Sequence, residues 1–428
     1  MFISNLKIKN FKSISSADIN FEPLTMLVGA NASGKSNLIN VFRFISNIAT
    51  DGIDNAIALQ GGMPYLANAS LPKGTPIEIA FTLDLSNEGW IRSPEHRTNG
   101  MEIKKIDYHF VIQPNLKGSG YHIVADALTL TFDWVNVDLT AKRENRYTPI
   151  GLQYTLTAEK KNAKSSIQLS HNFVPADKAD DKIQKIVEED ITPRVFARLC
   201  NEDKKELMLY RISMLLPAHF SENTFIRIFD FDPRELKKSS SMASMRILEE
   251  NGSNIASVLN SILRTKEKRK NLTTLLNEFL PFIESISIEN NFDKSFSYKV
   301  QEKFSNRAFH ANFLSDGTVS LLAIIIALYF EDMSNIIILE EPERNIHPKL
   351  LSNLLASAED VSGEKQVVIT THNPEFLKHI NIKNVRLIRR DAEGYTFISA
   401  PSNSETVKCF MENDLGLDDL FLQDMLGE

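Results

Sequence analysis

Alternating and continuous apolar segments predict strands in the first 160 residues. Leu24–Val28 is apolar except for Thr25, which is typical of a strand buried on both faces. Residues 2–8 and 17–21 alternate apolar and polar positions and predict two more strands. A β-rich part follows the turn at Gly61 and Gly62, with strands predicted over residues 77–83, 103–112, 121–131 and 152–158. Alternation of this kind favours an antiparallel sheet with one exposed face.

The pattern changes to helical spacing near residue 176. Helices are predicted over residues 181–200, 204–216, 242–250, 255–263 and 272–282. No heptad pattern persists, so we expect a helical insertion and no long coiled coil. Strands follow over 285–289 and 295–302, then a buried helix over 319–329. The four apolar residues at 336–339 predict a central strand, and residues 366–371 predict a buried strand.

Composition and charge describe an ordinary globular protein. Hydrophobic residues make up 43% and charged residues 24% of the 428 positions, which argues against global disorder. The net charge of −7 argues against a surface that binds polyanions everywhere, although a local basic patch remains open. Cys200 and Cys409 form no CxxC pair, which fits a reducing cytosol and argues against a disulfide scaffold or a zinc ribbon.

Nothing in the sequence predicts a membrane segment. The longest apolar run, near residues 321–330, is shorter than the roughly 20 residues that span a bilayer. The first residues lack the layout of a signal peptide. We therefore expect a cytoplasmic protein without a membrane partner.

Candidate chemistry begins at the segment Gly29-Ala30-Asn31-Ala32-Ser33-Gly34-Lys35-Ser36. It matches the phosphate-loop pattern G-x-x-x-x-G-K-[ST], between a predicted strand and a helix predicted over residues 37–45. Backbone N–H groups and the helix N-terminus would face a triphosphate there. Lys35 would reach the β- and γ-phosphates, and Ser36 would ligate Mg²⁺. The alternative is a chance glycine turn between a strand and a helix.

Three more segments in the last third carry candidate chemistry. Leu314-Ser315-Asp316-Gly317-Thr318 precedes a buried helix and is either a second anion site or a simple N-cap. The strand over 336–339 ends in Glu340 and Glu341, at the edge where α/β sheets bind ligands. One carboxylate can hold Mg²⁺ and the next can polarise water. The strand over 366–371 ends at His372, which is placed to bond a γ-phosphate or the attacking water.

The order of these four segments resembles the Walker A, signature, Walker B and H-loop motifs of ABC-type ATPases. Within them the chain resembles the RecF/SMC-like branch, in particular the stand-alone "AAA family" ATPases related to the ATPase domain of OLD-family proteins. Segments 11–13, 252–254 and 343–348 resemble further motifs of this branch. The resemblance implies an α/β fold: an ABC-type ATPase (P-loop NTPase) core with a flanking antiparallel β-sheet and a helical insertion. We expect an ATP-binding lobe over 1–175, the helical insertion over 176–284, and a signature, Walker B and H-loop lobe with a C-terminal tail over 285–428.

The resemblance also implies roles for single residues, with ATP and Mg²⁺ as cofactors. Glu341 would be the catalytic base, His372 the switch histidine and Lys35 the third catalytic residue. Ser36 and Glu340 would hold the metal. Nucleotide contacts would come from Gly29, Asn31, Ser33, Gly34, Lys35, Ser36, Asn37, Leu314, Ser315, Asp316 and Gly317.

Two positions depart from the commonest pattern. Asp316 stands where transporters carry glycine, and Glu340 replaces the commoner aspartate. Both variants look like ones that this branch uses, so we still expect an active site. Gln60 is a candidate for the Q-loop glutamine.

In this family, two chains joined head to tail sandwich two ATP molecules between Lys35 of one subunit and Ser315 of the other. We therefore expect a homodimer, or a higher even-numbered homo-oligomer, that ATP closes and hydrolysis releases. The first functional hypothesis is a DNA-linked ATPase of DNA repair or anti-phage defence. The second is a regulatory scaffold that holds and releases an effector protein encoded nearby, such as a nuclease or a toxin.

Two further functions are less compatible with the sequence. The segment after His372 is short for an added nuclease domain, and the signature variant argues against a transporter motor. Two smaller features stay open between alternatives. The basic cluster at 264–270 is a solvated helix end or a contact to nucleic-acid phosphates. The tail over 407–428 is a terminal helix packed on the core or a docking peptide.

Overall fold

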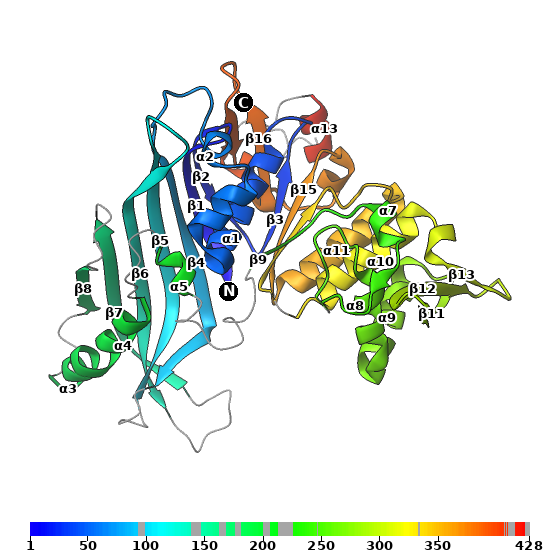
Figure 1. Ribbon diagram of the computed structural model, residues 1–428, viewed down its shortest axis with the longest axis horizontal. Coiled ribbons are helices and arrows are strands. Elements are labelled where there is room, and N and C mark those ends of the chain that lie inside the picture. Colours follow the sequence, from blue (N-terminus) through cyan, green and yellow to red (C-terminus); the bar gives the residue numbers. More distant parts are fainter. Residues whose placement is uncertain are drawn as a thin grey trace. The chain divides into compact units, whose positions relative to one another are not determined.

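The chain folds into two units, each assembled from segments that are far apart in sequence (Figure 1). The computed structural model describes residues 1–92, 99–137, 147–161, 168–175, 181–199, 206–212, 226–245, 247–332, 334–405, 407, 409 and 416–423. The first unit comprises Met1–Phe21, Ser36–Thr224 and Arg389–Ile398. The second comprises Glu22–Lys35, Phe225–Ile388 and Ser399–Glu428.

A seven-stranded antiparallel sheet forms the framework of the first unit, with strand order β2-β1-β4-β5-β6-β7-β8. The predicted strands of this region are present and are longer than expected. An additional strand, β8, was not predicted. The bounds are β1 Phe2–Phe11, β2 Ile14–Asn20, β4 Ile77–Arg92, β5 Asn99–Pro114, β6 Tyr121–Val137, β7 Tyr147–Lys161 and β8 Gln168–Val174.

One face of this sheet is covered by helix α1 (Lys35–Leu59) (Figure 1). On β5, Tyr108 and Phe110 are buried while their neighbour His109 is half-buried, as the two-residue period of a strand requires. The ring of Phe44 on α1 lies 5.8 Å from that of Phe11 and 6.4 Å from that of Phe110. The helix continues well past the predicted 37–45, across a kink at Gly52, because its apolar face stays buried along the sheet.

The short helices of the first unit follow its last strand. The predicted helix over 181–200 is confirmed across its described residues, although a π-helical turn interrupts it. Of the predicted helix over 204–216, only one turn lies within the described residues. The bounds are α2 Met63–Leu66, α3 Asp181–Ile186, the π-turn Val187–Ile191, α4 Thr192–Leu199 and α5 Leu209–Ile212.

A parallel sheet forms the framework of the second unit, in the order β16-β3-β15-β14-β9, and β17 follows β16 in the segment assigned to the first unit. The bounds are β3 Leu24–Val28, β9 Ile226–Phe229, β14 Ile336–Glu340, β15 Gln366–Thr371, β16 Val385–Arg390 and β17 Thr396–Ser399. Glu340 pairs with Thr370, and Thr371 pairs with Val28, so three strands end at the same edge. This edge is where parallel sheets bind ligands. Strand β9 comes from the part of the chain where we expected only helices.

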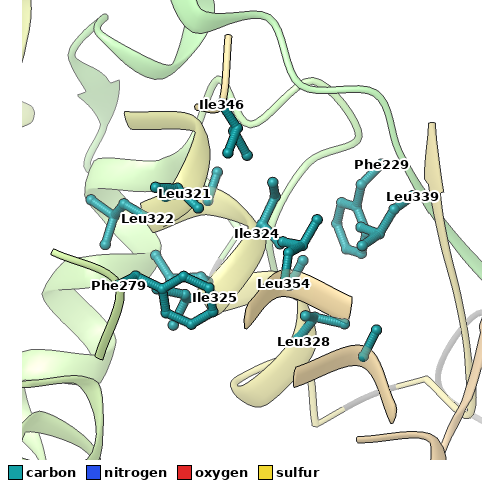
Figure 2. Close-up of a cluster of buried hydrophobic side chains, with 14 of the residues drawn as sticks. Phe229, Phe279, Leu321, Leu322, Ile324, Ile325, Leu328, Leu339, Ile346 and Leu354 are labelled. Atoms are coloured by element: carbon teal, nitrogen blue, oxygen red, sulfur yellow. The ribbon is translucent and has the colours of Figure 1, made fainter. Parts of the chain in front are cut away.

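Helix α10 (Asp316–Tyr329) is the centre of the second unit's core. All residues from 319 to 328 are buried, as expected of a helix that is apolar all round. Figure 2 shows Leu321, Ile325 and Leu328 of α10 in one cluster with Phe279 and Leu354 from neighbouring helices. The remaining elements are α7 Pro233–Leu236, α8 Ile255–Arg264, α9 Lys266–Phe279, α11 Leu351–Ser362, α13 Leu417–Leu422, β10 Ser240–Ser241, β11 Ile283–Asn290, β12 Ser295–Glu302 and β13 Ala308–His310.

The helix predicted over 242–250 is wrong. The described residues of this segment form turns, and the buried side chain of Asn254 binds their backbone. Its Oδ1 accepts from the N–H of Glu249 at 2.8 Å, and its Nδ2 donates to the carbonyls of Met245 and Ile247 at 3.1 and 2.7 Å. A side chain that takes these backbone groups competes with the hydrogen bonds of a helix.

The tail and the basic cluster pack as ordinary structure where they are described. Leu417 and Leu420 of α13 are buried in the core of the second unit, while residues 410–415 and 424–428 lie outside the described residues. Arg269 donates to the carbonyl of Leu263 in the last turn of α8, and Lys268 pairs with Asp332 at 2.5 Å. No helix in the described part of the chain is long and apolar enough to cross a membrane.

Candidate functional site

The phosphate loop connects β3 to α1, as predicted. Ala32 has a φ of 63° and Gly34 a φ of 111°, which closes the loop tightly. A Cβ on Gly29 would lie 2.3 Å from the carbonyl oxygen of Ile388, so the backbone there approaches its neighbour too closely for any side chain. Asn31 is exposed and Ser33 is buried. The loop therefore has the tight shape of an anion cradle.

Lys35 lies inside this loop. Its ammonium donates to the carbonyls of Gly29 at 2.8 Å and Ala30 at 3.0 Å, and the residue is 6% exposed. Burial lowers the pKa of Lys35, and the carboxylates of Glu341 and Glu343 oppose that shift. A buried cation held only by neutral carbonyls and a distant carboxylate suits an anionic ligand.

Glu341 follows β14 and lies close to Lys35. Its N–H donates to the carbonyl and the hydroxyl of Thr370 at 3.0 and 3.1 Å, which fixes the backbone after β14. Oε1 lies 3.8 Å from Nζ of Lys35 and 3.3 Å from Nδ1 of His372. Burial would raise the pKa of Glu341, but Arg344, His372 and Lys35 hold it below its ordinary value. The structure thus joins Lys35, Glu341 and His372, the three catalytic candidates of the sequence.

Glu343 is a further carboxyl at this edge that we had not assigned to the site. It is buried, and Oε1 accepts from the hydroxyl of Thr371 at 2.6 Å. Oε1 also lies 3.9 Å from Nδ1 of His372, while Oε2 has no hydrogen-bond partner among the described residues. Burial raises the pKa of Glu343. The carboxyl therefore steadies the end of β15, where His372 begins the next segment.

The two residues predicted to bind a metal, Ser36 and Glu340, both carry side-chain oxygens. Ser36 is exposed in the first turn of α1, and Glu340 ends β14. A hydroxyl and a carboxylate are hard ligands that fit Mg²⁺, which takes its remaining ligands from phosphate and water. The described residues contain no cluster of three or more His, Cys, Asp or Glu side chains that could hold a metal alone. The donor set therefore fits a nucleotide-bound Mg²⁺.

The predicted signature segment begins α10. Ser315 is the N-cap, and its hydroxyl accepts from the N–H of Thr318 at 3.2 Å. Asp316 pairs with Lys237 at 2.5 Å, and Leu314 is buried. A Cβ on Gly317 would lie 2.5 Å from the carbonyl oxygen of Asn345, so only glycine fits there. The N-cap that we considered as an alternative is present.

Arg344 and Asp230 also belong to the site, and sequence reasoning missed both roles. Nε of Arg344 lies 3.1 Å from Oε2 of Glu341, and Nη1 lies 2.7 Å from Oδ1 of Asp230. Asp230 comes directly after β9, the strand that was not predicted. The only available signal was the position of Arg344 in the segment 343–348.

In the first unit, the turn between β1 and β2 contacts the start of α1. Ser13 accepts from Nδ2 of Asn37 at 2.6 Å. Lys12 donates to Oε1 of Gln60 at 2.8 Å, and both line a cavity of about 610 Å³ together with Tyr65. Gln60, the Q-loop candidate, is thus a partner of Lys12, while the predicted nucleotide ligand Asn37 is bound to the segment 11–13.

Comparison with known proteins gives a family and a curated relative. A family model described as an AAA ATPase domain matches residues 1–377. Over 109 residues the chain is 29% identical to the DNA replication and repair protein RecF of Thermosynechococcus vestitus. That match covers 24% of this chain, and the chain spans only 27% of the length of that relative.

Among solved structures, SMC head domains are similar over most of the chain. The SMC head bound to the C-winged helix domain of ScpA has a TM-score of 0.49 at 12% identity, covering 93% of this chain and 97% of that one. The SMC head domain from Thermotoga maritima has a TM-score of 0.41 at 13% identity, covering 94% and 99%.

Proposed function

Because the chain belongs to the AAA ATPase domain family, we propose that it binds ATP with Mg²⁺ and hydrolyses it at the phosphate loop. The family and the RecF match bear out the resemblance to RecF/SMC-like ABC-type ATPases. The observation that carries the proposal is the meeting of Lys35, Glu341 and His372 at one edge of the parallel sheet.

Each of these side chains has a distinct role in the proposed reaction. Lys35 exchanges its two carbonyl partners for phosphate oxygens and neutralises their charge. Glu341 is ionised because its pKa is low, so it accepts hydrogen bonds from the attacking water. His372 donates to the γ-phosphate. Catalysis of this kind consists of positioning and charge neutralisation.

The remaining predicted ligands complete the proposed nucleotide site. Ser36 and Glu340 would hold Mg²⁺, which would supply positive charge next to the phosphates. The backbone of the phosphate loop and the first turn of α1 hold the phosphates. Gly29, Asn31, Ser33, Gly34 and Asn37 belong to these segments.

The variant Glu341→Gln tests hydrolysis directly. The amide cannot take up a proton, so we expect ATP to bind while turnover falls by about 100-fold or more. Phosphate release and nucleotide binding, measured on the same preparation, separate the two effects. Hydrolysis by the variant at the wild-type rate would contradict the assignment.

We propose further that two chains sandwich ATP head to tail, with Ser315 and Gly317 of one chain on the γ-phosphate held by Lys35 of the other. The N-capped start of α10 supports this, because its free N–H groups suit a phosphate. ATP then closes the dimer and hydrolysis releases it.

The match to RecF favours a role with DNA, either in repair or in defence against phage. ATP hydrolysis with and without duplex DNA tests this, with Glu341→Gln as the background. Strong stimulation supports a DNA-responsive ATPase. Activity that is indifferent to DNA favours instead a scaffold that holds and releases an effector protein.

A further inference from the structure

Arg344 joins two carboxylates at the edge of the parallel sheet. Its Nε lies 3.1 Å from Oε2 of Glu341, and its Nη1 lies 2.7 Å from Oδ1 of Asp230. The planar guanidinium fixes the direction of both contacts, which a single ammonium group cannot do. Arg344 therefore links Glu341 to a second, independent anchor.

The two oxygens of Glu341 have different surroundings as a result. Oε2 is held by Arg344, while Oε1 faces Nδ1 of His372 at 3.3 Å and Nζ of Lys35 at 3.8 Å. Without the arginine, rotation about the side-chain bonds of a glutamate would exchange or displace these oxygens. The arrangement presents one chosen oxygen to the phosphate loop.

The backbone supports this arrangement. Glu341 has a φ of 42°, and the N–H of Arg344 donates to the carbonyl of Glu341 at 3.1 Å, which closes a tight turn. The turn brings the arginine back to the carboxylate three positions earlier. A non-glycine residue in the left-handed region is energetically costly and often occurs at functional sites.

Asp230 is fixed by the sheet. It follows β9, which pairs in parallel with β14, and its N–H donates to the carbonyl of Glu250 at 2.9 Å. The register pairs Phe229 with Leu339, so Asp230 and Glu341 lie at the ends of adjacent strands. The backbone that carries the anchor of Arg344 is thus held by hydrogen bonds at the end of the neighbouring strand.

We propose that Arg344, anchored by Asp230, is a positioning residue that orients the carboxylate of Glu341 for ATP hydrolysis. The inference rests on the proposed function, because it assigns Arg344 a role in that same reaction. Misplacing a catalytic group by about 1 Å can cost about 100-fold in rate. Arg344→Ala should therefore lower kcat by about 10- to 100-fold and leave the KM for ATP nearly unchanged.

The test measures steady-state ATP hydrolysis and thermal unfolding of the full chain for a small set of variants. Arg344→Lys keeps the charge but reaches only one carboxylate, so it should recover part of the lost kcat. Asp230→Asn should lower kcat less than Arg344→Ala does. In the double variant, Asp230→Asn should cause no further loss of kcat beyond that of Arg344→Ala. Arg307→Ala, an exposed arginine in the same unit, is the matched control and should leave kcat unchanged.

The outcomes separate this inference from the proposed function. We expect kcat to fall in Arg344→Ala and in Asp230→Asn while thermal stability is unchanged. We expect the double variant to lose no more kcat than Arg344→Ala alone. A kcat for Arg344→Ala within about twofold of wild type or above it, while Glu341→Gln is inactive, overturns the positioning role alone. If Arg344→Ala instead lowers the unfolding temperature and raises the KM for ATP, Arg344 has a purely structural role. That result would also overturn the inference. A wild-type chain that neither binds nor hydrolyses ATP overturns the proposed function. The positioning role of Arg344 is then also wrong, because it concerns the same reaction.

Discussion

Lys35 supplies the positive charge at the centre of the phosphate loop. Its ammonium is held by two neutral carbonyls, and its nearest carboxylate oxygen, on Glu341, is 3.8 Å away. The cation is therefore shielded from water and only partly neutralised before a nucleotide binds. This is a costly arrangement for folding alone, since buried charges are stable only when well paired.

We predict that Lys35→Ala weakens ATP binding by about 10- to 100-fold, because a hydrogen bond to a charged group contributes about 1.5–3 kcal/mol. Titration with a fluorescent ATP analogue measures the change. Lys7→Ala is a matched control, because the ammonium of Lys7 forms an exposed ion pair with Asp18. Unaltered ATP affinity in Lys35→Ala would show that the loop holds no phosphate.

At the scale of elements, the buried carboxyl of Asp126 on β6 attaches a helical segment to the antiparallel sheet. The residue is 1% exposed, and it accepts from the hydroxyl of Tyr108 at 2.5 Å and the N–H of Met208 at 2.9 Å. The N–H of Leu209 in turn donates to the hydroxyl of Tyr108 at 3.1 Å. Burial raises the pKa of Asp126 to about 6.

This shift predicts a pH-dependent stability. The folded state holds the proton of Asp126 up to about pH 6, while the unfolded chain releases it near pH 4, so its stabilisation is lost as pH rises between these values. Relative to Asp126→Asn, the wild type should lose about 2 kcal/mol of unfolding free energy between pH 4 and pH 7. Urea unfolding at several pH values measures this, with Asp133→Asn on the same strand as the control. Parallel pH profiles for the wild type and Asp126→Asn would refute the prediction.

Elements with a strong local signal were predictable from the sequence, and elements that depend on distant partners were not. The continuous apolar runs of β3, β14 and β15 gave nearly the observed bounds, because burial on both faces selects the same residues in any context. β9 has only four residues, one of them Arg227, and becomes a strand by pairing with β14. The false helix over 242–250 has helically spaced apolar residues, but the side chain of Asn254 binds its backbone.

The residues of the candidate site also differ in whether the sequence alone could identify them. Lys35 ends the loop that follows β3, and Glu341 and His372 directly follow β14 and β15, so both the motifs and the strand pattern indicated these residues. Arg344 and Asp230 are 114 positions apart, and their contact exists only because two strands lie side by side. A pattern confined to one stretch of sequence holds no information about such a pair.

At the scale of the whole molecule, the signature segment 314–318 has no contact with the cluster of Lys35, Glu341 and His372 among the interactions described above. Ser315 caps α10, Asp316 is held by Lys237, and Gly317 packs on the carbonyl of Asn345. These contacts fix the N-terminus of α10, the end of a helix that favours negative charge. In the proposed dimer the anion is the γ-phosphate bound by the other chain, so each site needs Lys35 and Ser315 from different copies.

A mixing experiment tests this directly. Lys35→Ala and Ser315→Arg should each abolish hydrolysis, the second by placing bulk and charge where the phosphate of the partner belongs. In a mixed dimer, the intact Lys35 of one chain faces the intact Ser315 of the other, and one of the two sites is restored. An equal mixture forms mixed dimers about half of the time, so about one quarter of the wild-type activity should return.

Recovery of activity from two inactive variants requires a site shared between copies, since a site complete within one chain gains nothing from mixing. The Glu341→Gln variant tests dimer formation separately, because a chain that binds ATP without turnover should accumulate as the closed dimer. Light scattering measures the increase in molar mass when ATP is added. Mixing that restores no activity, while ATP still brings Glu341→Gln chains together, would place the signature segment outside the nucleotide site. The chains would then associate through a surface other than the signature segment.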